Sequence, residues 1–330
     1  EPLLKESNLL KISLEVAKKQ KIFVIFTESN SESRNQDFYK GVMNFEYLFV
    51  SGGGFSQTWK IWKWLHSNSV QEIVWGGWDR LSSLVNSLFS SKSKNSSIVE
   101  SAIFESRIVG LRALIKRGFM RRMVKVYVPG KSNAQLVRAL GFNGLVVSTG
   151  GCGILNYINQ PPFEARQKIE RFIFVGRLID VKNLELLIRV FNKMPKLSLT
   201  IVGFGELDSK LKAMANVNIE FVGAIANECL SEIYQAHDVF ILPSKSETWG
   251  LVVEEALNNG LPVIVSNRVG CGADLAIPEY GLVFDYQSED DLQMKILKML
   301  DVDFYNTLRK NISFLDFKSR ACVQVNSFVG

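Results

Sequence analysis

The chain has 330 residues, of which 47% are hydrophobic and 22% are charged. This length is sufficient for two packed domains, and the ordinary charged fraction argues against long disordered segments. No apolar run approaches the roughly 20 residues that a membrane-spanning helix needs, and the four scattered cysteines match neither a disulfide framework nor a zinc site. We therefore expect a cytoplasmic protein with reduced thiols, neither embedded in a membrane nor stabilised by disulfides.

The net charge of +6 is unevenly divided between the two halves of the chain. Residues 1–165 contain 21 Lys and Arg against 12 Asp and Glu, a net charge of +9, whereas residues 166–330 contain 18 against 21, a net charge of −3. This asymmetry predicts two domains with different partners, the first of which meets an anionic one. We expect no nucleic-acid partner, because the basic half contains no recognisable nucleic-acid-binding module.

Short β-rich runs alternate with helical patterns along the first half of the chain. The chain opens on a helical pattern over 3–19, whereas a doubly wound domain normally opens on a strand. A first strand and its following loop are therefore absent from the expected order. The pattern predicts strands over 21–29, 45–53, 72–78, 125–130 and 145–151, and helices over 56–68 and 79–91.

The second half repeats this alternation after a segment with two prolines, 156–167, which is predicted to be a linker. Predicted strands cover 171–177, 197–205, 219–225, 238–244 and 261–267. Predicted helices lie near 183–194, 206–215, 228–236, 250–259 and 288–300. The alternation predicts two doubly wound α/β domains with parallel sheets, which bind ligands at the carboxyl ends of their strands.

Two glycine-containing motifs of nucleotide-binding proteins are incomplete in this sequence. Gly130-Lys131-Ser132 resembles the end of a phosphate-binding P-loop, but Lys125 occupies the place of the required upstream glycine. We expect a turn followed by a helix there. Gly203 and Gly205 begin a dinucleotide-binding pattern whose third glycine is replaced by Asp208, so that pattern is rejected as well.

The sequence predicts neither a metal site nor a histidine-based catalytic site. Asp301 and Asp303 have the spacing of a metal-binding pair of aspartates, but they follow a helix in a predicted surface turn. His237 precedes a predicted strand and is expected to pack against a helix end, and His66 closes a predicted helix. Neither histidine has a nucleophile near it in the sequence, so neither is assigned a role.

Three segments of the second half together suit an anionic ligand. The strand over 171–177 ends in Arg177, and Lys182 follows five residues later, so two cations lie at a carboxyl end. The glycine turn after the next strand would let backbone approach a ligand closely. The third segment, SKSETWGLVVEEALNNG over 244–260, contains the glutamates Glu247, Glu254 and Glu255.

These segments resemble the donor-binding domain of glycosyltransferase family 4 (glycosyl transferases group 1), which are retaining enzymes of GT-B fold. The E-x7-E motif of the family is matched by Glu247 and Glu255, and its GR-L-x3-K element by Arg177 and Lys182 around Leu178. The match extends over about 165–285. The motifs occur in order and at the intervals of the family, which makes the resemblance specific.

The resemblance implies an α/β protein with two Rossmann-like domains facing a cleft. The acceptor domain would cover 1–160, without the first strand and glycine-rich loop of the family, and the donor domain 161–310. Residues 311–330 would form a C-terminal helix that crosses back to the first domain.

The resemblance also implies roles for the site residues. Arg177 and Lys182 would contact the donor diphosphate, together with backbone N–H groups at a helix N-terminus, over Thr248, Trp249, Gly250, Leu251 and Val252. Glu255 would bind the ribose, and Glu247 would hold the transferred sugar as the catalytic residue. Trp249 would be either a wall of the site or a core residue, and Glu254 would be a solvated charge. No metal and no cofactor are implied.

The implied activity is retaining transfer of a hexose from a nucleotide sugar, expected to be a UDP-sugar, to a sugar acceptor. The acceptor is expected to be lipid-linked, in the synthesis of a bacterial surface polysaccharide such as O-antigen or capsule. The alternative is a non-catalytic subunit that binds the nucleotide sugar within a glycosyltransferase complex.

Residues 106–128 hold seven cationic residues, with Ile108, Leu111, Ile115 and Phe119 interleaved among them. Such a segment can bind the anionic inner face of a plasma membrane. It can equally be an ordinary amphipathic helix with a solvated basic face, and the sequence leaves both interpretations open.

Overall fold

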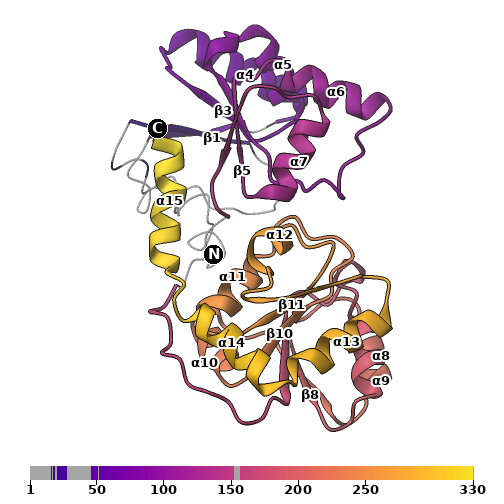
Figure 1. Ribbon diagram of the computed structural model, residues 1–330. Helices are drawn as coiled ribbons and strands as arrows, with labels where there is room; N and C mark the ends of the chain where they lie inside the picture. The colour runs from indigo at the N-terminus through magenta and orange to yellow at the C-terminus, as the bar shows by residue number, and fades with distance from the viewer. Residues whose placement is uncertain are drawn as a thin grey trace. The chain divides into compact units, whose positions relative to one another are not determined.

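The computed structural model describes residues 16, 18, 21–27, 46–50, 52–151 and 157–329. The chain divides into two compact units, which are Glu1–Leu155 with Ala321–Gly330 and Asn156–Arg320 (Figure 1). Each unit is an α/β structure with parallel strands, as predicted. The predicted helix over 3–19 lies outside the described residues except at Val16 and Lys18.

The second unit is built on a six-stranded parallel sheet of order β12-β11-β10-β7-β8-β9. Its strands are β7 Arg171–Val175, β8 Ser198–Val202, β9 Ile219–Gly223, β10 Val239–Leu242, β11 Val263–Ser266 and β12 Gly281–Phe284. Five of these six were predicted, and β12 was missed. Strands such as β10 are buried at every residue, as the strands of a sheet covered on both faces are.

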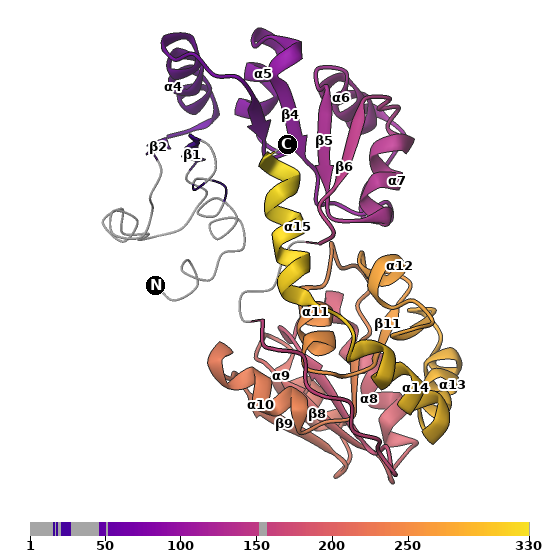
Figure 2. The same cartoon turned by 60° about the vertical axis from the view of Figure 1, so that its left-hand side comes forward.

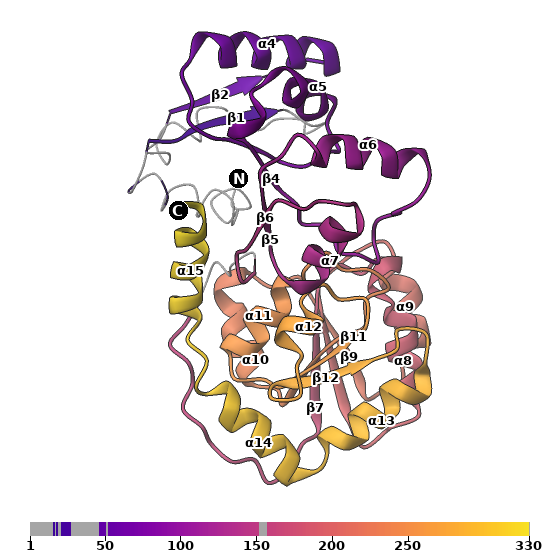
Figure 3. The same cartoon turned by 45° about the horizontal axis from the view of Figure 1, so that its top comes forward.

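Helices cover both faces of this sheet. They are α8 Leu184–Asn192, α9 Asp208–Met214, α10 Leu230–Gln235, α11 Leu251–Asn258, α12 Gly272–Leu275, α13 Glu289–Met299 and α14 Val302–Ile312, with 3-10 turns η2 Asp180–Lys182 and η3 Asn227–Cys229. Figures 1 and 3 show α8, α9 and α13 on one side of the sheet and α10 and α11 on the other. The largely apolar sequences of the central strands are typical of a sheet that is covered on both faces.

The strand order reverses direction between β7 and β10. The chain runs outward from β7 through β8 and β9, returns to β10 beside β7, and then runs outward on the other side through β11 and β12. The loops that follow β7 and β10 therefore diverge to opposite faces, which is the arrangement that opens a ligand crevice in such sheets. The two predicted sequence motifs lie in these two loops.

The first unit contains a two-stranded sheet and a four-stranded sheet, both parallel. The strands are β1 Phe23–Thr27, β2 Glu46–Val50, β3 Ile73–Trp75, β4 Asn95–Ile98, β5 Lys125–Val128 and β6 Leu145–Ser148. The helices are α4 Gly54–Ser67, α5 Leu81–Phe89, α6 Leu111–Met120 and α7 Lys131–Ala139, with a 3-10 turn η1 Lys92–Lys94. Figure 3 shows β1 and β2 side by side beneath α4.

Strand β4 was not predicted, because its sequence, NSSI, has no apolar run. Its first three residues are buried all the same, at most 1% exposed. Their polar groups are paired in the interior: the indole Nε1 of Trp75 donates to Asn95 Oδ1 at 3.1 Å, and Ser97 Oγ donates to the Trp75 carbonyl at 3.1 Å. Burial of polar side chains is tolerated when their hydrogen bonds are made within the protein.

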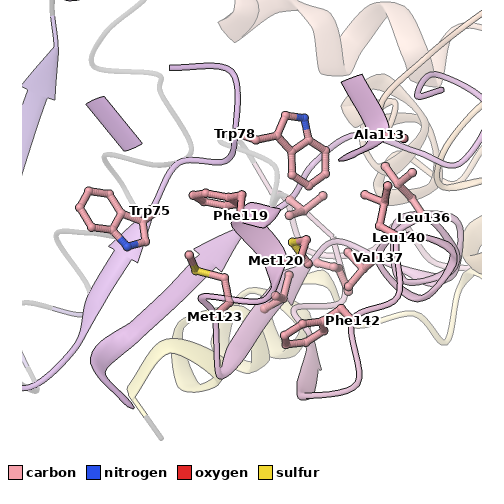
Figure 4. Packing of buried hydrophobic residues seen from close by; sticks show 13 residues of the cluster. Trp75, Trp78, Ala113, Phe119, Met120, Met123, Leu136, Val137, Leu140 and Phe142 are labelled. Carbon is pink, nitrogen blue, oxygen red and sulfur yellow. The ribbon is translucent and has the colours of Figure 1, made fainter. Parts of the chain in front are cut away.

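The core of the first unit includes residues of α6 and α7, which Figure 1 shows on the same side of β5 and Figure 2 shows from another direction. Figure 4 shows the buried cluster that includes Trp78, Phe119, Met120 and Leu136. The chain ends in helix α15 Phe317–Val329, and its residues from 321 onward belong to this unit. The Phe328 ring stacks on Tyr127 of β5, with ring centroids 4.5 Å apart. Among the described residues, no helix is long and apolar enough to cross a membrane.

Candidate active site

The turn after β7 packs backbone to backbone against the turn after β8. A Cβ atom on Gly203 would overlap the Gly176 carbonyl, and one on Gly205 would overlap the backbone of Leu178. Gly203 also has a φ of 136°, a backbone conformation that residues other than glycine rarely adopt. These glycines therefore allow the turn after β8 to pack closely against the turn that carries Arg177, and their approach to a ligand stays a prediction.

Arg177 and Lys182 leave the carboxyl end of β7 in different environments. The Arg177 side chain is exposed, whereas the Lys182 side chain is 14% exposed and forms an ion pair with Glu247. The turn that carries Lys182 ends at Asn183, whose backbone is in the left-handed region with a φ of 58°. Asparagine tolerates this conformation, and its Nδ2 donates to the Tyr286 carbonyl at 2.9 Å. The topology thus brings Lys182 and Glu247 together from strands that lie side by side.

The loop that carries Glu247 is anchored on both of its sides. On one side, Lys245 N donates to the Val181 carbonyl at 2.8 Å, and Lys245 Nζ pairs with Asp180 at 2.6 Å. On the other, Glu247 N donates to the Arg268 carbonyl at 2.9 Å. The Glu247 side chain is 19% exposed. Its position is therefore fixed by backbone contacts to two neighbouring loops.

Sequence reasoning missed the second of these loops, over 268–270. Gly270 N donates to the Glu247 carbonyl at 2.8 Å, and a Cβ on Gly270 would overlap the Thr248 carbonyl. Only glycine fits at this close approach. The signal that could have found the loop is the pair Gly270 and Gly272 directly after the buried strand β11.

The five residues predicted to bind diphosphate through backbone N–H groups lie at the N-terminus of α11. Gly250 is the N-cap of the helix, with φ 98° and ψ 64°, and no side chain caps it. Leu251 and Val252 are the first two residues of α11, preceded by Thr248 and Trp249. The first N–H groups of a helix have no intrahelical acceptor, and the helix dipole adds roughly half a positive charge there, which favours an anion.

Glu255 lies on α11 and is held by a buried tyrosine. The hydroxyl of Tyr234, on α10, donates to Glu255 Oε2 at 3.1 Å. Burial raises the pKa of Glu255 to about 7, although the hydrogen bond from Tyr234 acts in the opposite direction. The carboxyl group therefore titrates near neutral pH.

The prediction that Glu254 is a solvated charge is wrong. Glu254 is 3% exposed, and its Oε1 accepts a hydrogen bond from the indole Nε1 of Trp249 at 2.5 Å. Trp249 is itself 3% exposed and lies in the interior. An outward position was expected because Glu254 is one residue off the motif spacing, but Glu254 lies on a buried face of α11, with Val253, Ala256 and Leu257, whereas Glu255 is partly exposed.

The remaining candidates have structural partners. Asp301 caps α14, because its Oδ1 accepts from the backbone N–H groups of Asp303 and Phe304 at 3.1 and 3.2 Å. The ring of His237 contacts the Ile233 carbonyl at 2.7 Å and Thr200 Oγ1 at 2.8 Å, as expected for a packed histidine. Over the described ranges, no three His, Cys, Asp or Glu side chains are grouped so as to hold a metal ion.

The β7–β10 switch point gathers charged groups of both signs on the loops and the helix that follow two neighbouring strands. It combines the cations of Arg177 and Lys182 on one loop, the N-terminus of α11, and the partly exposed carboxylates of Glu247 and Glu255. A helix N-terminus with nearby cations suits a diphosphate, and a carboxylate suits a vicinal diol because it is a pure acceptor.

The fold places the protein in the GT-B class of glycosyltransferase structures. The apo form of the lipopolysaccharide outer core galactosyltransferase WaaB superposes with a TM-score of 0.72 at 15% identity, covering 98% of this chain and 92% of that chain. Anabaena Alr3699/HepE in complex with UDP-glucose superposes with a TM-score of 0.69 at 13% identity, covering 98% and 95%. At these identities the likeness defines the fold.

Residues 158–313, which lie within the second unit, match the model of the family described as glycosyl transferases group 1. The chain is 37% identical over 134 residues to sulfoquinovosyl transferase SQD2 of Arabidopsis thaliana, which is 39% of this chain and 26% of that protein. It is 35% identical over 156 residues to the O-antigen biosynthesis glycosyltransferase WbnH of Escherichia coli, which is 46% and 44%. The chain thus spans less than half the length of these curated relatives.

Proposed function

We propose that the protein is a glycosyltransferase that transfers a sugar from a nucleotide-sugar donor to a saccharide acceptor. One observation carries the proposal: the strand order brings Arg177, Lys182, Glu247 and Glu255 to the same switch point of a group 1 family domain. The names of the relatives support a place in glycan synthesis, since WbnH is an O-antigen glycosyltransferase and WaaB a lipopolysaccharide galactosyltransferase.

In the proposed complex the diphosphate lies at the N-terminus of α11. Arg177 and Lys182 contact its oxygens, and Lys182 exchanges part of its contact with Glu247 for the diphosphate. Charge develops on the departing phosphate in the transition state, so fixed cations lower the barrier, each by about 3 kcal/mol where a single group has been removed from comparable sites. Glu255 accepts hydrogen bonds from the ribose hydroxyls.

The proposed transfer retains the anomeric configuration. The bond between the anomeric carbon and the phosphate oxygen breaks, and the acceptor oxygen bonds to the same carbon on the same face. The acceptor hydroxyl proton passes to the departing phosphate, so no protein nucleophile is required. Glu247 holds hydroxyls of the transferred sugar and opposes the positive charge of an oxocarbenium-like centre. In this mechanism Arg177, Lys182 and the N-terminus of α11 supply the positive charge without a metal ion.

We propose a UDP-sugar as the donor and a lipid-linked saccharide as the acceptor. UDP is the nucleotide in several structural neighbours, among them HepE with UDP and with UDP-glucose. A lipid-linked acceptor requires the protein to work at a membrane surface, and the first unit has a suitable face.

The segment 106–128 presents apolar and basic groups to solvent on α6. Leu111 is 75% exposed and Ile115 48%, whereas Phe119 is 3% exposed and belongs to the core. Arg112 is exposed beside them on the same helix. This face is proposed to bind anionic lipid, to which each basic residue near the surface contributes about 1 kcal/mol. Equal and salt-insensitive co-sedimentation with neutral and anionic vesicles would contradict it.

The test of the function begins with UDP binding measured by calorimetry, followed by a transfer assay across a set of nucleotide sugars. Binding with turnover supports the proposal, and binding without hydrolysis or transfer of any donor supports a non-catalytic binding subunit instead. A thermal-shift screen selects the donor, because a ligand at 100 times its Kd adds roughly 2.7 kcal/mol of stability.

A further inference from the structure

Tyr234 lies outside every donor-site motif of the sequence, yet its hydroxyl contacts the candidate site. Its side chain is 1% exposed, and its ring meets Phe240 of β10 edge to face, with centroids 6.0 Å apart and planes at 63°. The ring is therefore fixed between α10 and the sheet. From this position its hydroxyl donates to Glu255 Oε2 at 3.1 Å.

This contact bears on what Glu255 can bind. An ionised carboxylate has two acceptor oxygens, and a ribose diol offers two hydroxyl donors. A hydrogen bond from Tyr234 fixes one oxygen and the plane of the carboxylate, and it favours the ionised form that a diol requires. Glu255 needs this support because burial raises its pKa to about 7.

The other ionisable groups nearby are engaged elsewhere. Glu254, the neighbour of Glu255 on α11, accepts from Trp249. Glu247, on the preceding loop, pairs with Lys182. Among the described residues, Tyr234 is the ionisable side chain that perturbs the pKa of Glu255.

We propose that Tyr234 is a positioning residue for donor binding: its hydroxyl orients the Glu255 carboxylate and keeps it in acceptor form for the ribose hydroxyls. The inference rests on the proposed function, in which Glu255 binds the ribose. It extends that function to α10, a helix that contributes no residue to the sequence motifs.

The test compares Tyr234→Phe with wild type, using UDP and 2′-deoxy-UDP as probes and calorimetry from pH 5.5 to 9. The substitution keeps the ring and its contact with Phe240, so only the hydroxyl is lost. We expect UDP affinity at pH 7 to fall about tenfold, since hydrogen bonds to charged groups contribute enough for such a factor. The loss should be smaller for 2′-deoxy-UDP, which lacks one of the two hydroxyls.

The pH profile separates positioning from mere structural support. Ribose binding needs ionised Glu255, so affinity falls as pH decreases through the pKa of that group. Removal of the tyrosine hydroxyl raises this pKa further, and the decline in the variant should therefore begin at a higher pH. Incorporation of 3-fluorotyrosine at position 234, which keeps the ring and donates more strongly, should shift the decline to lower pH.

Tyr305→Phe is the matched control. Tyr305 is also 1% exposed in the same unit, and its hydroxyl donates to the Asp238 carbonyl at 2.9 Å, away from Glu255. The Tyr305→Phe variant should bind UDP with the affinity and the pH profile of the wild-type protein.

Two results would overturn the inference while leaving the donor site standing: wild-type affinity and pH profile in both Tyr234 variants, or equal losses for the two nucleotides. If wild type binds no UDP, the proposed UDP site is refuted and the role of Tyr234 falls with it. The two failures are therefore distinguishable.

Discussion

Trp249 and Glu254 form a buried pair whose coupling can be measured. Each side chain is 3% exposed, and the indole Nε1 donates to Glu254 Oε1 at 2.5 Å. Trp249→Phe removes this donor while it retains most of the aromatic volume. A buried carboxylate that loses a donor is less well stabilised, because the energy of desolvation is no longer balanced by that hydrogen bond.

The expected loss is about 2 kcal/mol for Trp249→Phe, within the range for hydrogen bonds to charged groups. Glu254→Leu should also be destabilising, because it leaves the indole N–H without this acceptor. In the double variant both partners are removed, and replacement of a buried polar pair by apolar groups is often close to neutral. The double variant should therefore be more stable than the sum of the two single changes predicts, by at least about 1 kcal/mol.

The measurement is a double-mutant cycle from denaturant and thermal unfolding of the full chain, followed through the second unit. For a unit of this size, 2 kcal/mol corresponds to a decrease of roughly 4–8 °C in Tm. Strict additivity of the two single substitutions would refute the reasoning, since it would show that the indole and the carboxylate do not stabilise each other. A gain in stability for Trp249→Phe alone would refute it as well.

Four further predictions concern the site and its frame. Gly203→Ala should destabilise the second unit by more than 1 kcal/mol, because a Cβ there overlaps the Gly176 carbonyl and φ is 136°; unchanged denaturant unfolding would contradict the packing of the two turns. Glu247→Ala should abolish sugar transfer with near-wild-type circular dichroism, and near-normal turnover would remove the mechanism. Wild-type UDP affinity should fall as pH decreases through about 7, where Glu255 takes up a proton, and Glu255→Gln should remove that dependence. Asp301→Ala should lower the free energy of unfolding by about 1 kcal/mol, because the N-cap of α14 is lost. It should leave the rate of sugar transfer unchanged at every divalent-ion concentration, and a metal-dependent change in that rate would refute the purely structural role of Asp301.

The sequence predicted strands whose buried residues are apolar, and it failed to predict a strand whose buried residues are polar. Strands β7, β8, β10 and β11 are apolar runs in a doubly covered sheet, and each was found near its observed limits. Strand β4 was missed because its buried residues are polar and paired with side chains far along the chain. Long-range hydrogen bonds of this kind leave no local periodicity, so no pattern search could have identified the strand.

The two adjacent glutamates of α11 show the same limit within the site. The motif spacing selected Glu255 over Glu254, but whether Glu254 is solvated depends on which faces of the helix are covered. The partners of both side chains, Trp249 and Tyr234, lie five and 21 residues away. Tyr234 had no motif to mark it, so only the packing of α10 against α11 could have revealed its contact.

The ion pair of Lys182 and Glu247 gives an electrostatic argument about the order of donor contacts. Both side chains are largely buried, at 14% and 19% exposure, so in the absence of donor each charge is balanced by the other. Arg177, by contrast, is exposed. In the proposed site an incoming diphosphate therefore meets the exposed Arg177 before it draws the largely buried Lys182 away from Glu247. Glu247 then becomes available to the sugar hydroxyls at the step that needs a carboxylate beside the anomeric carbon. Separate loss of Arg177 should thus weaken UDP binding, whereas loss of Lys182 should affect both binding and the rate of transfer.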